Sequence, residues 1–203
     1  KTTEHVLAAL VGLEIDNILI EINAEEPPIM DGSSKFFVDA LEKAGLQELS
    51  SLRNEYIVKD IISFNDPDSG SEITLIPSEN YQITTMVDYE TKVLGTQNAT
   101  LTKLSEFKGD FSNARTFSFL HEIEMLLENN LIKGGDLNNA IVYVDKKISE
   151  NTMEKLKKAF NKDKVSVKSN GILDNLNLHY QNEAARHKLL DVLGDLALIG
   201  KRI

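Results

Sequence analysis

Cysteine is absent from the chain. Its absence excludes disulfide bonds and thiolate metal sites, and it is compatible with the reducing cytoplasm, where we expect the protein to act. Any bound metal would have to sit on histidine and carboxylate side chains, and the 203 residues include four histidines. The search for a metal site therefore begins at those four positions.

The sequence also lacks a long apolar run and an excess of basic residues. No run approaches the roughly 18 apolar residues of a membrane-spanning helix, and the first residues do not have the pattern of a signal peptide. Lysine and arginine number 22 against 32 acidic residues, which gives a net charge of −10. Because phosphate binding needs clustered basic side chains, we expect neither a nucleic-acid partner nor a membrane span.

The composition is that of an ordinary globular protein, with 41% hydrophobic and 27% charged residues. The length suits one domain or two small ones. Thr2-Thr3, Ser33-Ser34 and Thr116 are candidates to cap helices that follow them. Segments with helix-forming residues and start or stop signals predict helices at residues 4–10, 35–44, 104–111, 117–130, 152–160 and 182–199.

Runs rich in β-branched and aromatic residues alternate with turn residues along the chain. They predict strands at residues 18–22, 56–64, 72–76, 81–89, 93–101 and 140–144. The four central runs are typical of an antiparallel meander. The order of helices and strands favours an α+β protein of two units over a doubly wound sheet.

The last predicted helix has an unusual polar face. His187, Asp191, Gly194 and Asp195 lie on one stripe, opposite a broad apolar face. Two aspartates four residues apart repel each other, and a glycine inside a helix costs roughly 1 kcal/mol relative to alanine. We therefore expect a cation against this stripe and a close approach of another group to the backbone at Gly194.

The two ends of the chain together supply the ligands for a metal. His5 lies at the start of the first helix beside Glu4, and His187 and Asp191 lie in the last helix. Two imidazoles and one carboxylate can hold a divalent metal with an open position, and a second carboxylate can act on a water there. If the two segments meet, the protein is a metal hydrolase or lyase, and otherwise these are ordinary helix-surface residues. The other histidines, His121 and His179, have no such neighbours, and we interpret them as a helix-surface and a loop residue.

Several motifs in a fixed order resemble one enzyme family along essentially the whole chain. They are Thr2-Thr3-Glu4-His5-Val6-Leu7-Ala8-Ala9-Leu10, Gly12-Leu13-Glu14-Ile15-Asp16-Asn17, Pro28-Ile29-Met30-Asp31-Gly32-Ser33, Ala114-Arg115-Thr116-Phe117, Gly134-Gly135 and Arg186-His187-Lys188-Leu189-Leu190-Asp191-Val192-Leu193-Gly194-Asp195-Leu196. The chain closely resembles the UDP-3-O-acyl-N-acetylglucosamine deacetylases, the zinc enzymes of bacterial lipid A synthesis. The implied substrate is a UDP-linked acylated amino sugar, and the implied cofactor is Zn²⁺.

The resemblance implies roles for the end segments. His5, His187 and Asp191 are implied as the three zinc ligands, with water in the fourth position. Glu4 is implied as the general base that takes a proton from the attacking water. Lys188 is implied as a charged contact in the site.

Further roles follow from the same resemblance. The Thr116 hydroxyl is implied to stabilise the oxyanion, a role that it can hardly combine with capping a helix. Phe117 and Glu122 lie where the family contacts the sugar. The acyl chain needs an apolar groove, for which residues 141–143 are candidates.

The resemblance also implies that this chain is part of a longer protein. In the family, Asp195 orients a second catalytic histidine beyond the last helix, and no histidine follows His187 here. Without that partner we expect the pKa of Asp195 to be raised. The implied fold is α+β, with two similar units whose helices lie between two mostly antiparallel sheets (a β-α-α-β sandwich). Residues 1–53 would be the C-terminal part of an incomplete first unit, and residues 54–203 the second unit.

Two alternatives compete with a zinc deacetylase. A non-haem iron enzyme also uses two histidines and one carboxylate, although it gives no reason for an acid at Glu4. A non-catalytic fragment or interaction module would keep the scaffold without the chemistry. The sequence does not determine the oligomeric state, the preferred acyl length, or whether a second enzyme is fused to the chain, as in some family members. We expect the 203 residues alone to bind zinc weakly and to turn over poorly.

Overall fold

The computed structural model describes residues 2–123, 139–146, 148–159, 163–173 and 176–203. Helices and small, mostly antiparallel sheets are mixed along this part of the chain, so the predicted α+β class is confirmed. The division into two similar units with helices between two sheets stays a prediction. Among the described residues, no helix has both the length and the apolar character that crossing a membrane requires.

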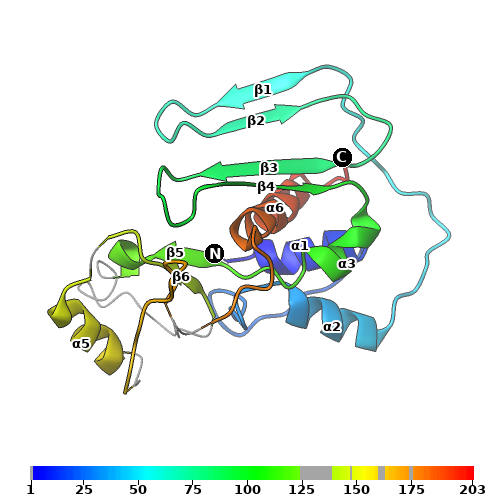
Figure 1. The fold of residues 1–203 in the computed structure, drawn as a ribbon. Helices are drawn as coiled ribbons and strands as arrows, with labels where there is room; N and C mark the ends of the chain where they lie inside the picture. The colour runs from blue at the N-terminus through cyan, green and yellow to red at the C-terminus, as the bar shows by residue number, and fades with distance from the viewer. Residues whose placement is uncertain (1, 124–138, 147, 160–162, 174–175) are drawn as a thin grey trace.

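Helix α6 (Glu183–Leu196) lies at the centre of the fold. One side packs against helix α1 (Glu4–Gly12), and another packs under the sheet of β3 (Ile83–Asp88) and β4 (Thr96–Leu101), as Figure 1 shows. Alternate residues of β3 point inward, as expected of a strand with one covered face. The predicted long helix at the end of the chain is therefore confirmed, with its last residues forming the short 3-10 helix η2 (Ala197–Ile199).

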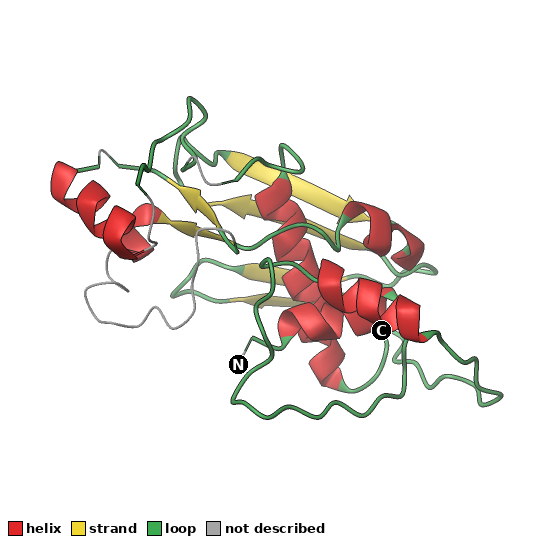
Figure 2. Cartoon of the chain, turned by 90° about the horizontal axis from the view of Figure 1, so that it is seen from below, coloured by secondary structure: helices red, strands yellow, loops and turns green. Residues whose placement is uncertain are grey.

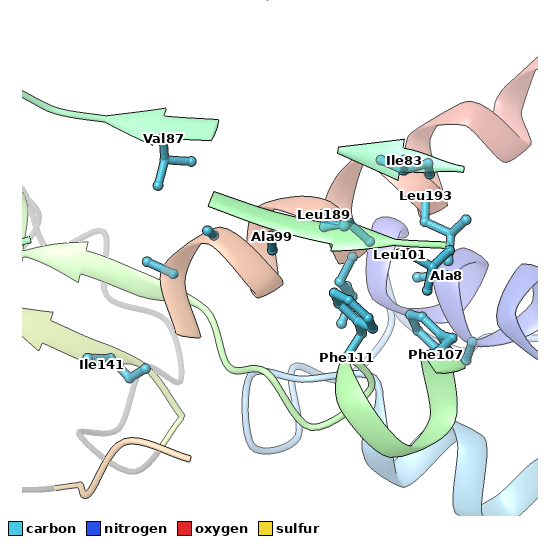
Figure 3. Packing of buried hydrophobic residues seen from close by; sticks show 14 of the residues in the cluster. Ala8, Ile83, Val87, Ala99, Leu101, Phe107, Phe111, Ile141, Leu189 and Leu193 are labelled. Carbon is cyan, nitrogen blue, oxygen red and sulfur yellow. The ribbon is translucent and has the colours of Figure 1, made fainter. Parts of the chain in front are cut away.

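The main core forms where α6 faces these two neighbours. Leu189 and Leu193 are fully buried and point toward Leu101 of β4 and Ala8 of α1 (Figure 3). Phe107 closes the core from the short helix α3 (Phe107–Asp110), which follows the 3-10 helix η1 (Leu104–Glu106). Helix α2 (Lys35–Ala44) packs beside α1 and ends at Gly45, as predicted.

The predicted central strands form two hairpins. Strand β1 (Ile62–Asn65) pairs antiparallel with β2 (Glu72–Leu75), and β3 pairs antiparallel with β4. The strands are shorter than the sequence runs, and no pairing joins β2 to β3 among the described strands, so the meander is only partly confirmed. The strand expected at residues 18–22 is wrong: this segment is exposed and pairs with no strand of the described part, and strand hydrogen bonds require a partner.

The helix predicted at residues 117–130 is corrected at its start. Residues 117–119 form strand β5 (Phe117–Phe119), which pairs parallel with β6 (Ile141–Tyr143), and the helix begins at residue 120. The amide of Ile141 donates to the Thr116 carbonyl, so tertiary pairing overrides the local helix pattern. Residues 124–130 of the predicted helix and the Gly134-Gly135 motif lie outside the described residues.

A second, smaller core lies between β6, the helical residues 120–123 and helix α5 (Glu150–Ala159), which is at the far left of Figure 2. It contains Leu120, Ile123, Val142, Leu156, Val165 and Leu173. Residues 141–143, considered for an acyl groove, are all buried in the two cores. They are therefore packing residues in this structure and do not line an open groove.

We expect Leu193→Ala to lower the free energy of unfolding by about 2–5 kcal/mol, because it removes buried methyl groups and leaves a cavity between α6 and its neighbours. Urea denaturation monitored by circular dichroism measures this change. Leu198→Ala is the control, because Leu198 is 69% exposed and its loss should change stability by less than about 0.5 kcal/mol. Equal effects of the two substitutions would contradict the assigned core.

Candidate metal centre

The two end segments of the chain meet in the fold. Ligand atoms of His5, His187 and Asp191 all lie within 4.8 Å of one another. Asp191 Oδ1 is 3.2 Å from His187 Nε2 and 3.8 Å from His5 Nε2. Both imidazoles are buried, with their rings edge to face at a centroid distance of 5.0 Å. The segments that contain His5 and His187 therefore come together, which the sequence alone left undecided.

The donor atoms of this group suit a cation. His187 Nδ1 lies 3.0 Å from the carbonyl oxygen of Ala114, so Nδ1 carries a proton and donates to this oxygen, while Nε2 faces Asp191. Asp191 Oδ1 is buried and has no hydrogen-bond partner among the described residues. Two electron-rich atoms that face each other in a buried site are stabilised by a divalent metal. The residues therefore fit a metal with two nitrogen ligands and one oxygen ligand.

Burial favours the neutral form of His5, which is the form that binds metals. It lowers the pKa of His5, and the neighbouring His187 imidazole lowers it further, against the opposing charges of Asp191, Glu4 and Asp31. A lowered pKa keeps the imidazole neutral at neutral pH, and the neutral form binds metals.

Two charged side chains flank the group. Lys188 Nζ donates to Asp191 Oδ2 at 2.9 Å. Burial lowers the pKa of Lys188, but the charge and hydrogen bond of Asp191, with Tyr89 and Asp195, outweigh this effect and leave the pKa raised. The pKa of Asp195 is raised by partial burial and by the charges of Asp191 and Glu4, which is the direction expected from the sequence.

The contact between α1 and α6 is as close as the sequence predicted at Gly194. A Cβ atom at Gly194 would lie 2.1 Å from the backbone oxygen of Glu4, the residue before His5. Only a hydrogen fits at that position. Gly194 thus lets the first turn of α1 approach the polar stripe of α6 and brings His5 to the other two ligands.

The turn at residues 31–34 joins this pair of helices to a third segment. The Ser34 hydroxyl donates to the His5 carbonyl at 2.7 Å, and the Ser34 amide donates to the Ser112 carbonyl at 2.9 Å. The Gly32 carbonyl accepts from the Thr116 amide at 2.7 Å. The cap predicted at Ser33-Ser34 is thus confirmed in part: the Ser33 hydroxyl accepts from the Lys35 amide at 3.1 Å, whereas the Ser34 hydroxyl bonds to α1. Thr3 makes no side-chain cap bond. The Asp31-Gly32-Ser33 motif thus has a structural role between His5 and residues 112–116.

The predicted site residues around Thr116 lie in the segment that follows Ala114. Thr116 precedes strand β5, so it does not cap a helix at Phe117. Phe117 packs edge to face against Tyr89 and Tyr143. Glu122 accepts hydrogen bonds at 2.8 Å from the Ser118 hydroxyl and the Phe119 amide. Glu4 is partly buried in the first turn of α1 beside His5.

Sequence reasoning missed a buried ion pair next to the candidate metal ligands. Arg115 Nε lies 2.8 Å from Glu183 Oε1, and both side chains are almost fully buried. The signals were the place of Arg115 inside a family motif and the place of Glu183 one helical turn before His187. His179 is a loop residue, as predicted, and its Nδ1 lies 2.9 Å from the Asn113 carbonyl. His121 is a partly exposed helical residue, as predicted, that also contacts Asp145 at 3.1 Å.

The fold and the site define an α+β protein in which two histidines and one aspartate form a group that could hold a metal ion. The family model of UDP-3-O-acyl N-acetylglycosamine deacetylase matches residues 1–165 and 152–203, and the chain belongs to this family. It is 45% identical, over its whole length, to 44% of the bifunctional enzyme LpxC/FabZ of Porphyromonas gingivalis. It is 37% identical, again over its whole length, to 58% of the UDP-3-O-acyl-N-acetylglucosamine deacetylase of Citrifermentans bemidjiense. The chain thus spans about half the length of the curated relatives that it matches.

We expect Gly194→Ala to weaken zinc binding by about 10–100-fold, because a methyl group there must push the His5 end of α1 away from α6. Competition with a chromogenic chelator measures the affinity. Gly109→Ala is the matched control, since its new methyl group would meet no atom within 4 Å. Unchanged zinc affinity in Gly194→Ala would show that this contact does not set the position of His5.

Proposed function

We propose that the protein containing this chain is a zinc-dependent deacetylase. It would hydrolyse the acetamide of a UDP-linked 3-O-acylated N-acetylglucosamine, releasing acetate and the free amine for lipid A synthesis in the cytoplasm. The observation that supports this most directly is the convergence of His5, His187 and Asp191 from opposite ends of the chain. Membership of the deacetylase family supports the reaction and the substrate class.

The three converging side chains would hold Zn²⁺. When bound, the zinc would polarise the acetyl carbonyl and lower the pKa of a water molecule. Neutral imidazoles suit this role, since burial keeps His5 unprotonated and the Ala114 carbonyl holds the proton of His187 on Nδ1. Lys188 holds the other carboxylate oxygen of Asp191, so Oδ1 is left to the metal.

Two carboxylates next to His5, His187 and Asp191 are assigned to the proton-transfer steps. Glu4 precedes His5 in the first turn of α1, and its carboxylate would take the proton from the attacking water. Asp195 lies one turn beyond Asp191 and has a raised pKa. It would orient the second catalytic histidine, the acid that protonates the leaving amine, as its family position implies.

The remaining assignments concern the substrate. The Thr116 hydroxyl would donate to the oxyanion that forms at the acetyl carbon. Backbone bonds to Gly32 and Ile141 hold Thr116 in place, which suits a group that must be positioned in advance. Phe117 and Glu122 are assigned to contacts with the sugar, and Lys188 to a charged contact with the substrate.

We expect Glu4→Gln in the full-length gene product to keep its zinc and to lose about 10²–10⁴-fold in deacetylation rate, because the amide cannot accept the proton from water. A discontinuous assay of the UDP-linked substrate, with separation of the amine product, measures the rate. Glu21→Gln is the control, since Glu21 is an exposed acid outside the site. Full deacetylase activity of both Glu4→Gln and His187→Ala would overturn the roles proposed for these residues. A wild-type protein that does not deacetylate the substrate would favour the interaction module.

Metal analysis separates the zinc enzyme from the non-haem iron alternative. We expect about one zinc per chain in the purified full-length protein, removal of activity by a chelator, and its recovery with zinc under anaerobic conditions. Iron at the same stoichiometry, together with turnover that requires oxygen, would instead support the iron enzyme.

A further inference from the structure

One buried carboxylate has no part in the proposed reaction. Glu183 lies in the first turn of α6 and is 0% exposed, although carboxylates are rarely buried without a specific partner. It occupies the same helix face as His187 and Asp191, at successive four-residue steps. Glu183 thus lies one helical turn before the candidate ligand His187, and its contacts show which segment it holds there.

The Glu183 carboxylate binds both the backbone amide and the side chain of Arg115. Its Oε1 accepts from the Arg115 amide at 3.2 Å and from Arg115 Nε at 2.8 Å, and its Oε2 accepts from Nη2 at 3.3 Å. The His179 amide also donates to Oε2, at 2.6 Å, and the Asn177 carbonyl accepts from Arg115 Nη2 at 2.6 Å. Arg115 is thus fixed from several directions.

The amide of Arg115 and the carbonyl of Ala114 belong to the same peptide unit. Its N–H donates to Glu183, and its C=O, which accepts from His187 Nδ1 at 3.0 Å, points the opposite way because the peptide is trans. Glu183 and His187, four residues apart in α6, therefore bind opposite sides of the rigid Ala114–Arg115 peptide. This peptide cannot rotate without breaking both contacts.

We propose that Glu183 and Arg115 are positioning residues for the metal centre. They hold the Ala114–Arg115 peptide in the orientation in which its carbonyl accepts from His187 Nδ1. That hydrogen bond selects the Nδ1-protonated tautomer and directs the Nε2 lone pair toward Asp191. The inference rests on the proposed role of His187 as a metal ligand.

The test uses Glu183→Gln, which keeps the shape of the side chain and removes its charge. In the metal-free protein we expect ¹⁵N NMR of the imidazole to show a smaller fraction of His187 protonated at Nδ1 in Glu183→Gln than in the wild type. We also expect zinc affinity to fall by about 10–100-fold, measured by chelator competition on the full-length protein.

The matched control is Thr85→Val. The buried Thr85 hydroxyl donates to the Ala185 carbonyl at 3.0 Å, on the same helix but on the side that faces β3. Its loss should lower stability and leave both the His187 tautomer and the zinc affinity unchanged. If Glu183→Gln does not fold, Arg115→Lys takes its place, since lysine keeps the positive charge without the planar fork, and we expect shifts in the same direction.

Two outcomes would contradict the proposals, and they are distinguishable. A wild-type tautomer and zinc affinity in Glu183→Gln, with only a loss of stability like that of Thr85→Val, would show that the ion pair serves the fold alone. Failure of the wild-type protein to bind zinc would overturn the proposed function. The tautomer, which is measured without metal, would still decide the positioning role.

Discussion

Helices α1 and α6 meet where the backbone of Gly194 touches the carbonyl of Glu4, and the candidate site depends on this contact. It brings His5, near the start of the chain, beside a stripe of residues close to its end. The leucines on the other faces of α6 bury the main core against β3, β4 and α1. Thus a single helix supplies both the centre of the hydrophobic core and two of the three metal-ligand candidates.

The polar groups that contact His5 and His187 also connect these residues to other segments of the chain. Each one has a partner that also fixes a neighbouring segment: Ser34 bonds to the His5 carbonyl, and the Ala114 carbonyl bonds to His187. Within the described residues, Asp191 Oδ1 is the exception in the site, since it is buried and has no hydrogen-bond partner. Because unpaired polar atoms are costly to bury, this exception is consistent with a site built for a cation.

Some local features could be predicted from neighbouring residues, and others depended on distant ones. The last helix, strand β6 and the close approach at Gly194 were predicted correctly, because each has a strong local pattern. The start of the helix at residue 117 was wrong because pairing with β6, more than 20 residues away in sequence, makes residues 117–119 a strand. Ser34 resembled a helix cap in sequence, but a backbone carbonyl 29 residues away accepts its hydroxyl proton.

The residue types by themselves determined the kind of metal site. With no cysteine and four histidines, only imidazoles and carboxylates can serve as ligands, and the spacing of His187 and Asp191 places them on one helix face. The tertiary structure alone decided that His5 joins them and that the Ala114 carbonyl accepts from His187 Nδ1. Those contacts join residues far apart in the chain, and their geometry depends on how closely two helices can pack, which no local pattern specifies.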